Sequence, residues 1–300
     1  MEKQALAEQT VIISCAMTGT ATPKGKNGAL PVTPQEIAED AVAAWKAGAA
    51  VVHLHMRDEE QKGVMDWRRF QETVRLIRSH PECDVIINCT SSGGPGPDGL
   101  YSNHARMAHF RNVPEIELGS FDAGTFNWGD TKEFNNDPAF LKELANTYLE
   151  CGVKPEVEIF DMGMLGNARH YYEKLKLIQA PMWCQFVLGV LGGMEATVEN
   201  LQYLVRHLPQ GCLWSATGIG AGHLPILYAA IALGANGVRV GLEDNLYMDR
   251  GVPATNASLV ERAAQLIRLF NKTPATPAQA RQLLGLPPFR GGAEQSQESR

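Results

Sequence analysis

The amino-acid sequence predicts a single-domain α/β protein, a (β/α)8 barrel that occupies residues 1–290. Eight apolar, strand-like segments alternate with eight segments of helical periodicity along the chain. No linker or change in composition divides the sequence, which favours one domain. An open, doubly wound sheet is the alternative, but residues 18–31, after the first strand, contain no GxGxxG. The polar residues 291–300 are expected to be a disordered tail.

The predicted elements follow one another in a regular order. Strands are expected at residues 11–17, 49–55, 84–89, 115–118, 155–160, 182–188, 212–216 and 237–241. Helices are expected at residues 34–47, 67–79, 103–110, 138–151, 168–178, 197–205, 225–232 and 256–270, with a short one at 277–284. The first helix has the clearest boundaries, because Thr33 is a suitable N-cap, Pro34 follows it, Glu36 completes a capping box and Gly48 ends the pattern.

Composition argues against several classes of function. The net charge is −6 and no long basic run occurs, which argues against a nucleic-acid surface. No apolar run reaches the roughly 18 residues of a membrane-spanning helix. Residues 1–10 are polar and lack a signal-peptide core, so we expect a cytoplasmic protein. The six cysteines show no CxxC spacing and are expected to be reduced.

The second predicted strand carries two histidines, in the sequence His53-Leu54-His55. Alternate side chains of a strand point to the same face, so His53 and His55 project together. Two imidazoles at the C-terminal end of a rigid strand supply two ligands of a three-ligand metal site. The alternative is that both are core histidines. The other six histidines are expected to be surface or structural, although His223 follows a rim loop and could contact a ligand.

A third ligand must come from elsewhere in the chain, and Glu243 is the natural candidate. In a barrel the loops after the strands build the site, and the eighth strand is followed by the segment Arg239–Asn245. Two histidines and a carboxylate suit catalytic Zn²⁺ and also Fe²⁺. The alternative reading of Glu243 and Asp244 is a solvated acidic turn.

Other side chains of the predicted rim suit substrate chemistry. Arg239 would keep Asp244 ionised and oriented as a general base, although the two could instead form a structural salt bridge. The loop Ser91–Gly94 offers hydroxyl and N–H groups to a carboxylate or an oxyanion. Thr125 and Asn127 are further donors, equally suited to an Asx turn. A covalent nucleophile, Cys89 or Ser91, is the lesser option because neither has a base nearby in the sequence.

These segments together resemble the β-keto acid cleavage enzymes, from about residue 10 to residue 286. The resemblance rests on Leu30–Pro34, Gly48–Asp58, Ser91–Gly94, Gly124–Asn127, Phe186–Gly189, Gly218–Gly220, Arg239–Asn245 and Ala275–Arg281. It implies a zinc-dependent barrel that exchanges fragments between a β-keto acid and acetyl-CoA, giving acetoacetate and a new CoA thioester. It also implies a homotetramer.

Residue roles carry over to the matching positions. By resemblance, His53, His55 and Glu243 would hold zinc, and Asp244, oriented by Arg239, would be the base. By the same resemblance, the substrate's carboxylate end would be bound by Ser91, Ser92, Gly94, Thr125 and Asn127.

One position departs from the aminohexanoate-cleaving members of the family. Where those enzymes carry an acidic residue that meets an ammonium group, this chain has Ala21. We therefore expect an uncharged or hydroxylated substrate rather than an amino-substituted one. The alternatives are a metal-dependent hydrolase or aldolase that uses the same three ligands without CoA, and a non-catalytic barrel that binds a metabolite.

Overall fold

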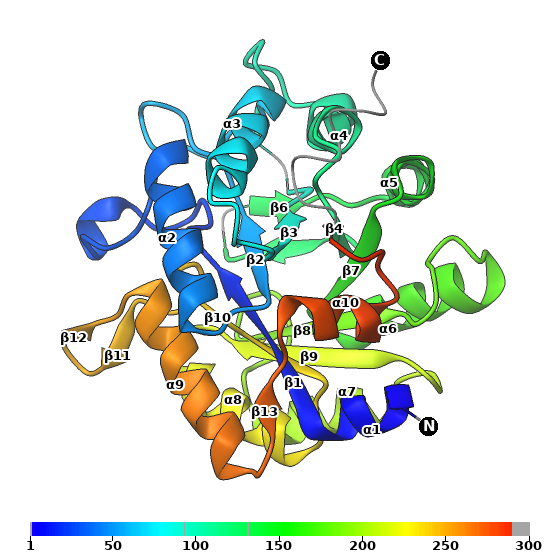
Figure 1. The fold of residues 1–300 in the computed structure, drawn as a ribbon. Coiled ribbons are helices and arrows are strands. Elements are labelled where there is room, and N and C mark those ends of the chain that lie inside the picture. The colour runs from blue at the N-terminus through cyan, green and yellow to red at the C-terminus, as the bar shows by residue number, and fades with distance from the viewer. Residues whose placement is uncertain (1, 93, 131, 290–300) are drawn as a thin grey trace.

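The computed structural model describes residues 2–92, 94–130 and 132–289, which form a closed barrel of parallel strands (Figure 1). The barrel strands are β1 (Thr10–Ala16), β2 (Val51–Leu54), β3 (Ile86–Cys89), β4 (Leu118–Asp122), β7 (Lys154–Ile159), β8 (Trp183–Leu188), β9 (Leu213–Gly218) and β10 (Gly237–Val240). Strand β10 pairs in parallel with β1, which closes the sheet. The predicted (β/α)8 barrel is confirmed, and the predicted tail at 291–300 lies outside the described residues.

Helices surround the barrel and complete each βα unit (Figure 1). They are α2 (Pro34–Ala47), α3 (Trp67–Arg78), α4 (Asn103–Asn112), α5 (Pro138–Cys151), α6 (Met162–Arg169), α7 (Val198–Arg206), α8 (His223–Ala232) and α9 (Asn256–Leu269). A π-helical turn, η2 (His170–Lys174), continues α6. The capping box of α2 forms as predicted between Thr33 and Glu36, and Gly48 ends that helix with a left-handed φ of 115°.

One end of the barrel is covered by the two ends of the described chain. Helix α10 (Pro277–Leu284) and helix α1 (Glu2–Gln9) contact each other there, and β13 (Thr273–Pro274) pairs with β1. Leu283 and Leu284 of α10 belong to one buried cluster with Ile12 and Trp183. Because this covers the N-terminal ends of the strands, the opposite end is left for a functional site.

The structure differs from the predicted elements in the loops, at the fourth strand and at the helix predicted at residues 168–178, which begins at Met162 and, with η2, ends at Lys174. Strand β4 spans Leu118–Asp122 rather than the predicted residues 115–118, because its second half, with Ser120 and Asp122, is polar and resembles a loop in the sequence; Arg281 Nε donates to Oε2 of the preceding Glu117 at 2.6 Å. Two hairpins were not predicted. They are β5 (Phe126–Trp128) with β6 (Lys132–Phe134), and β11 (Tyr247–Asp249) with β12 (Val252–Pro253).

Toward the open end the barrel interior is polar, whereas the covered end of the interior, with Ile12 and Trp183, and the layer between barrel and helices are apolar. Asn88 of β3 donates to Glu156 of β7 at 2.6 Å, and Ser120 of β4 donates to Glu158 at 2.9 Å. Strands β3 and β7 are not neighbours, so the first of these bonds crosses the interior. Buried polar side chains on the strands therefore form the support beneath the open end.

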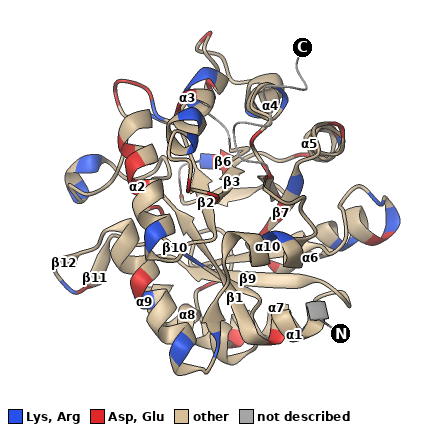
Figure 2. Cartoon of the chain, viewed as in Figure 1, with Lys and Arg blue, Asp and Glu red and all other residues tan. Residues whose placement is uncertain are grey.

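The outer surface carries charges of both signs. Figure 2 shows Lys, Arg, Asp and Glu interspersed on the helices that surround the barrel. Among the described residues, no helix is both long enough and apolar enough to cross a membrane.

Candidate active site

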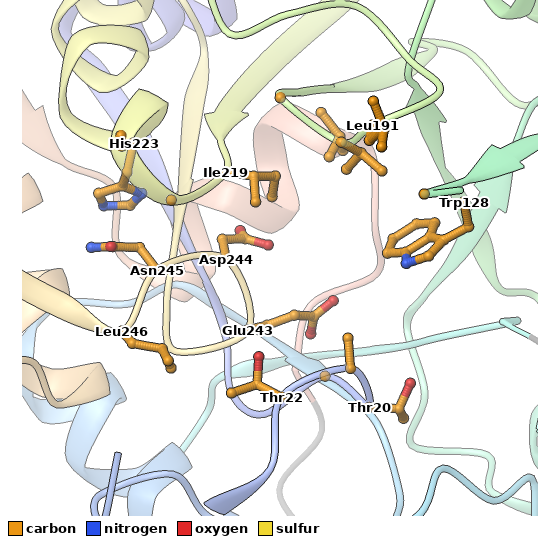
Figure 3. Close-up of a pocket in the computed structure, with 18 of the residues that line it drawn as sticks. Thr20, Thr22, Trp128, Leu191, Ile219, His223, Glu243, Asp244, Asn245 and Leu246 are labelled. Carbon is orange, nitrogen blue, oxygen red and sulfur yellow. The ribbon is translucent and has the colours of Figure 1, made fainter. Parts of the chain in front are cut away.

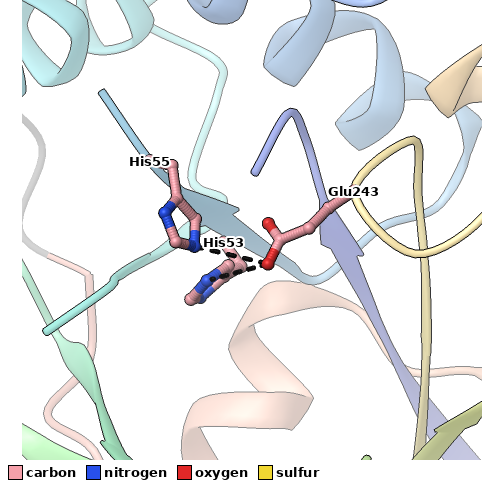
Figure 4. A group of neighbouring side chains, drawn as sticks. All are labelled: His53, His55 and Glu243. Atoms are coloured by element: carbon pink, nitrogen blue, oxygen red, sulfur yellow. Dashed lines mark ion pairs between the residues drawn. The ribbon is translucent and has the colours of Figure 1, made fainter. Parts of the chain in front are cut away.

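Three predicted ligands meet at the open end of the barrel. His55 Nε2 lies 3.3 Å from Glu243 Oε1, and His53 Nε2 lies 3.9 Å from the same oxygen (Figure 4). One potential ligand atom from each residue lies within 4.8 Å of the other two. For metal–ligand distances of about 2.1 Å, the edge of a tetrahedron is about 3.4 Å, so the spacing is close to that of a metal site.

The backbone explains how residues 190 positions apart reach one site. Ala16 of β1 pairs in register with His53 of β2, and the Glu243 N–H donates to the carbonyl of the same Ala16 at 3.2 Å. Gly241 makes this approach possible: a Cβ there would lie 2.1 Å from the Ala16 carbonyl oxygen, and its φ is +133°. Strand β1 therefore holds the histidines and the glutamate in a fixed relation.

The protonation states of these side chains suit a cation. Burial lowers the pKa of His53 well below its ordinary value, which keeps the imidazole neutral. Burial opposes ionisation of Glu243, but His55, Arg239 and His53 together hold its pKa well below the usual range. Glu243 Oε2 is buried and has no hydrogen-bond partner among the described residues. The neutral imidazole of His53 and the ionised carboxylate of Glu243, with its unused oxygen, are donors of the kind that a divalent metal requires.

A second acidic group lies beside His53, deeper in the barrel. One possible ligand atom each from His53, Glu156 and Glu158 lies within 4.8 Å of the other two. Both Glu156 oxygens already accept hydrogen bonds, one from Asn88 and one from Trp183 Nε1 at 2.8 Å. Glu158 accepts from Ser120 and lies 3.5 Å from Arg239 Nη1. These carboxylates are therefore engaged with protein donors, whereas the set containing Glu243 faces a cavity.

Asp244 and Arg239 form a buried pair directly beside the three predicted ligands. Arg239 Nε and Nη2 donate to the two Asp244 oxygens at 2.9 and 3.0 Å, and Nη2 also donates to Glu243 at 2.8 Å. Thr217 donates to Asp244 Oδ2 at 3.1 Å. Burial raises the pKa of Asp244, while Arg239 and Thr217 oppose that rise. The result is an oriented carboxylate that is more basic than an exposed aspartate, as a general base requires.

A cavity of about 1280 Å³ opens over these groups (Figure 3). His55, Glu243 and Asp244 line it, together with Thr20, Ala21 and Thr22 of the loop after β1. Aromatic and apolar side chains supply another part of its wall: Tyr101, Trp128, Phe134, Phe160, Val190 and Leu191. In the view of Figure 3, Glu243 and Asp244 lie between Trp128 on one side and His223 on the other.

The predicted substrate-binding residues are placed differently from one another. Ser92 lines the cavity, and its Oγ lies 3.5 Å from His55 Nδ1. Gly94 and Ser92 also border a small void of about 10 Å³ beside His55. Ser91 is fully buried and donates to the Ser120 carbonyl at 2.7 Å. The Thr125 hydroxyl bonds within its own loop, at 2.8 Å from the Asn136 N–H.

Neither Thr125 nor Asn127 is among the described residues that line the cavity. Asn127 is exposed on β5, and its carbonyl packs against Gly192, where a Cβ would lie 1.7 Å away. The nucleophile option is weakened for Cys89, because burial raises the pKa of its thiol well above the ordinary value. All six cysteines are free.

Sequence reasoning did not find the side chains that hold these loops. Arg57 of the HxHxRD segment donates to the Thr18 and Gly19 carbonyls at 2.9 and 3.0 Å, which fixes the loop after β1. Arg106 of α4 has a similar role behind Ser91, to whose carbonyl it donates at 2.7 Å. Arg57 lies in the Gly48–Asp58 segment that carries the resemblance, but that segment gave no sign of its role, and nothing in the pattern of α4 marked Arg106.

Comparison with known proteins gives one consistent result. The sequence profile of the beta-keto acid cleavage enzyme family matches residues 10–286. The 3-keto-5-aminohexanoate cleavage enzyme of Fusobacterium nucleatum is 37% identical over 280 residues, covering 93% of this chain and 98% of that protein. The 3-dehydrocarnitine:acetyl-CoA trimethylamine transferase of Rhizobium meliloti is 36% identical, covering 92% and 96% of the two chains.

A solved structure agrees at the level of the fold. The apo structure of ObcA superposes with a TM-score of 0.75 at 22% identity, over 86% of this chain. The match spans 66% of the ObcA chain, just under two thirds. At this identity the likeness shows the fold alone.

Proposed function

The chain belongs to the beta-keto acid cleavage enzyme family, and from this membership we propose that it exchanges acyl groups between a 3-oxo acid and acetyl-CoA. The products would be acetoacetate and a new acyl-CoA. One observation carries the proposal: His53 meets His55 and Glu243, which line a large cavity, directly beside the Arg239–Asp244 pair. The name of the Rhizobium relative supports acetyl-CoA as the second substrate.

We assign metal binding to His53, His55 and Glu243. Bound there, a divalent cation such as Zn²⁺ would supply Lewis-acid polarisation of the substrate ketone. The residues fit this group because the imidazole of His53 is held neutral, Glu243 is held ionised, and Glu243 Oε2 lacks a partner among the described residues. Fe²⁺, Co²⁺ and Mn²⁺ accept similar ligands, so the assignment of these three residues holds for any of these metals.

Recognition of the substrate's carboxylate is assigned to the loop after β3 and the loop after β4. Ser92 and Gly94 border the space beside His55, and the Ser92 hydroxyl lies 3.5 Å from His55 Nδ1. Ser91, Thr125 and Asn127 are also proposed to bind the substrate's carboxylate. The hydrogen bonds of the Ser91 and Thr125 hydroxyls to the protein keep the two loops in shape.

Asp244 is the proposed base. Its carboxylate removes a proton from C2, the carbon between the ketone and the carboxylate of the acid. The carbanion attacks the acetyl carbonyl, the C–S bond breaks, and CoA leaves as a thiolate. The thiolate then adds to the original ketone, the C2–C3 bond breaks, and C2 of acetoacetate regains a proton from Asp244. Arg239 lies within 3.0 Å of Asp244 and favours the negative charge that develops in each step.

The side chain of the 3-oxo acid is proposed to be uncharged or hydroxylated. Ala21 lines the cavity at the position where the aminohexanoate-cleaving members carry an acidic residue. An Ala21→Glu variant tests this assignment: activity toward a 5-amino-3-oxo acid is expected to rise and activity toward the matching unsubstituted acid to fall. Equal activity of the wild type toward both acids would contradict it.

A panel assay tests the proposed reaction. Zinc-loaded protein is mixed with acetyl-CoA and a series of 3-oxo acids, and acetoacetate and acyl-CoA are measured together. The two products are expected in equal amounts and only when CoA thioester is present. Turnover of esters, amides or aldols without CoA would instead support the hydrolase or aldolase reading. The expectations of a homotetramer and a cytoplasmic location stay predictions, and sedimentation velocity tests the first.

A further inference from the structure

We propose that Arg106 is a positioning residue for recognition of the keto acid's carboxylate, because it holds two walls of the cavity in a fixed relation. This inference rests on the proposed function. Arg106 itself is buried and is not among the described residues that line the cavity, so it acts through its neighbours.

Every nitrogen of the Arg106 guanidinium has an acceptor. Nε donates to the Ser91 carbonyl at 2.7 Å, Nη1 to the Asn135 carbonyl at 2.9 Å, and Nη2 to Asn136 Oδ1 at 2.5 Å. The group also lies 3.7 Å from the ring centre of Phe140, which restricts the plane of the fork. Three acceptors from two separate loops require a planar fork with several donors, which lysine lacks.

The first wall lies directly beside the proposed metal ligands. Ser91, held by Arg106, is followed by Ser92, whose hydroxyl lies 3.5 Å from His55 Nδ1. Ser92 borders both the large cavity and the small void beside His55. A shift of the Ser91 carbonyl would therefore move the proposed carboxylate donor relative to His55.

The second wall is the loop and hairpin after β4. Asn136, held by Arg106, is 2% exposed; its N–H donates to the Thr125 hydroxyl and its Nδ2 to the Gly124 carbonyl at 3.3 Å. Between Thr125 and Asn136 lies the β5–β6 hairpin, whose Trp128 and Phe134 line the cavity. Arg106 thus links the serine wall to the aromatic wall through one buried cation.

Such a link matters because displacements of about 1 Å in a binding group can reduce rates by roughly 10²-fold. Burial lowers the pKa of Arg106 to about 10, so the guanidinium remains cationic at neutral pH. Replacement of Arg106 by Lys keeps the charge but leaves at least one loop unheld. The expected effect is a selective loss of carboxylate recognition, with the metal ligands unchanged.

Two ligands distinguish a loss of carboxylate recognition from a general loosening of the cavity. Acetoacetate carries a ketone and a carboxylate, whereas pentane-2,4-dione replaces the carboxylate by a methyl ketone of similar shape. Dissociation constants of both are measured by calorimetry with zinc-loaded wild type, Arg106→Lys and Arg111→Lys. Arg111 is the matched control, because it lies on the same helix but pairs with the exposed Glu150 at 2.9 Å.

Arg106→Lys is expected to weaken acetoacetate binding about ten- to hundredfold, the range of hydrogen bonds to charged groups, and pentane-2,4-dione binding less than about twofold. Its KM for the keto acid is expected to rise far more than its kcat falls, with an unchanged KM for acetyl-CoA. Arg111→Lys is expected to match the wild type. Equal weakening of both ligands, or of neither, would overturn the proposal.

Two further outcomes are decisive. If Arg106→Lys does not fold, Asn136→Ser, which withdraws one acceptor of the fork, takes its place and is expected to give the same selective loss. If the wild type transfers no acyl group, the proposed function fails and this inference with it. If the wild type is active and Arg106→Lys resembles Arg111→Lys, only the positioning role fails.

Discussion

Replacement of Asp244 by Asn isolates the proposed proton transfer. The amide keeps the shape of the carboxylate and one acceptor oxygen for Arg239, whose nitrogens lie 2.9 and 3.0 Å from the two Asp244 oxygens. In either orientation it also places an N–H₂ group opposite an Arg239 N–H, because both Asp244 oxygens accept from Arg239. The lost base is expected to lower kcat roughly 10²–10⁴-fold, equivalent to about 3–5 kcal/mol in the barrier.

The effect of replacing Thr217 on kcat can be estimated from the same geometry. Thr217→Val removes one hydrogen bond to the Asp244 carboxylate, worth about 1.5–3 kcal/mol, so its kcat is expected to fall about ten- to hundredfold. Glu60→Gln is the control for the carboxylate-to-amide change, because the Glu60 side chain is 72% exposed and pairs with Lys62 on the surface. It is expected to behave as the wild type.

Exchange of the C2 protons of acetoacetate in D₂O, followed by NMR without acetyl-CoA, reports the proton transfer directly. The wild type is expected to accelerate this exchange, and Asp244→Asn to lose the acceleration while it keeps its metal. If Asp244→Asn exchanged these protons as fast as the wild type, or turned over fully, Asp244 would not be the base.

Other expected outcomes concern stability. Gly241→Ala would bring a Cβ to 2.1 Å from the Ala16 carbonyl, so we expect a loss of several kcal/mol in unfolding free energy and weaker metal binding. Gly234→Ala is its control, because Gly234 has a φ of +84° but a Cβ there would meet no atom within 4 Å; it should cost about 1 kcal/mol of unfolding free energy. Urea titrations and zinc affinities compare the two variants. Burial lowers the pKa of His109, stacked on Phe70, to about 3. Only the unfolded chain binds this proton between about pH 6.5 and 3, so stability falls as the pH drops through that range. His109→Phe should remove this loss, which is about 3 kcal/mol by pH 4. Urea titrations at pH 7 and pH 4 measure the unfolding free energy of both proteins, and an equal fall between the two pH values would contradict the prediction.

Local patterns in the sequence predicted much of the fold. The same-face projection of His53 and His55 follows from the two-residue period of a strand, and the capping box of α2 follows from Thr33 and Glu36. Strand β4 was displaced in the prediction because its second half, with Ser120 and Asp122, is polar. The polarity suits the barrel interior, which sequence periodicity does not distinguish from a loop.

The site was less predictable than the fold, because it depends on contacts between distant loops. The distance from Glu243 to the histidines depends on the register of β1, which a single sequence does not encode locally. Thr125 carries a hydroxyl suited to a ligand, yet in the structure that hydroxyl bonds to Asn136. Arg106 shows the opposite case, since its neighbours along α4 give no sign of the loops that it holds.

The central claim is that one divalent cation binds His53, His55 and Glu243. The most direct test is the zinc content per chain of the wild type and of Glu243→Gln after dialysis against a limiting zinc buffer. Glu156→Gln is measured beside them, because Glu156 belongs to the deeper acidic group near His53. We predict one zinc per chain in the wild type and in Glu156→Gln, and little in Glu243→Gln, since a neutral amide is a poor zinc ligand. Equal zinc in the wild type and Glu243→Gln, or a fully active wild type free of any divalent metal, would contradict the account.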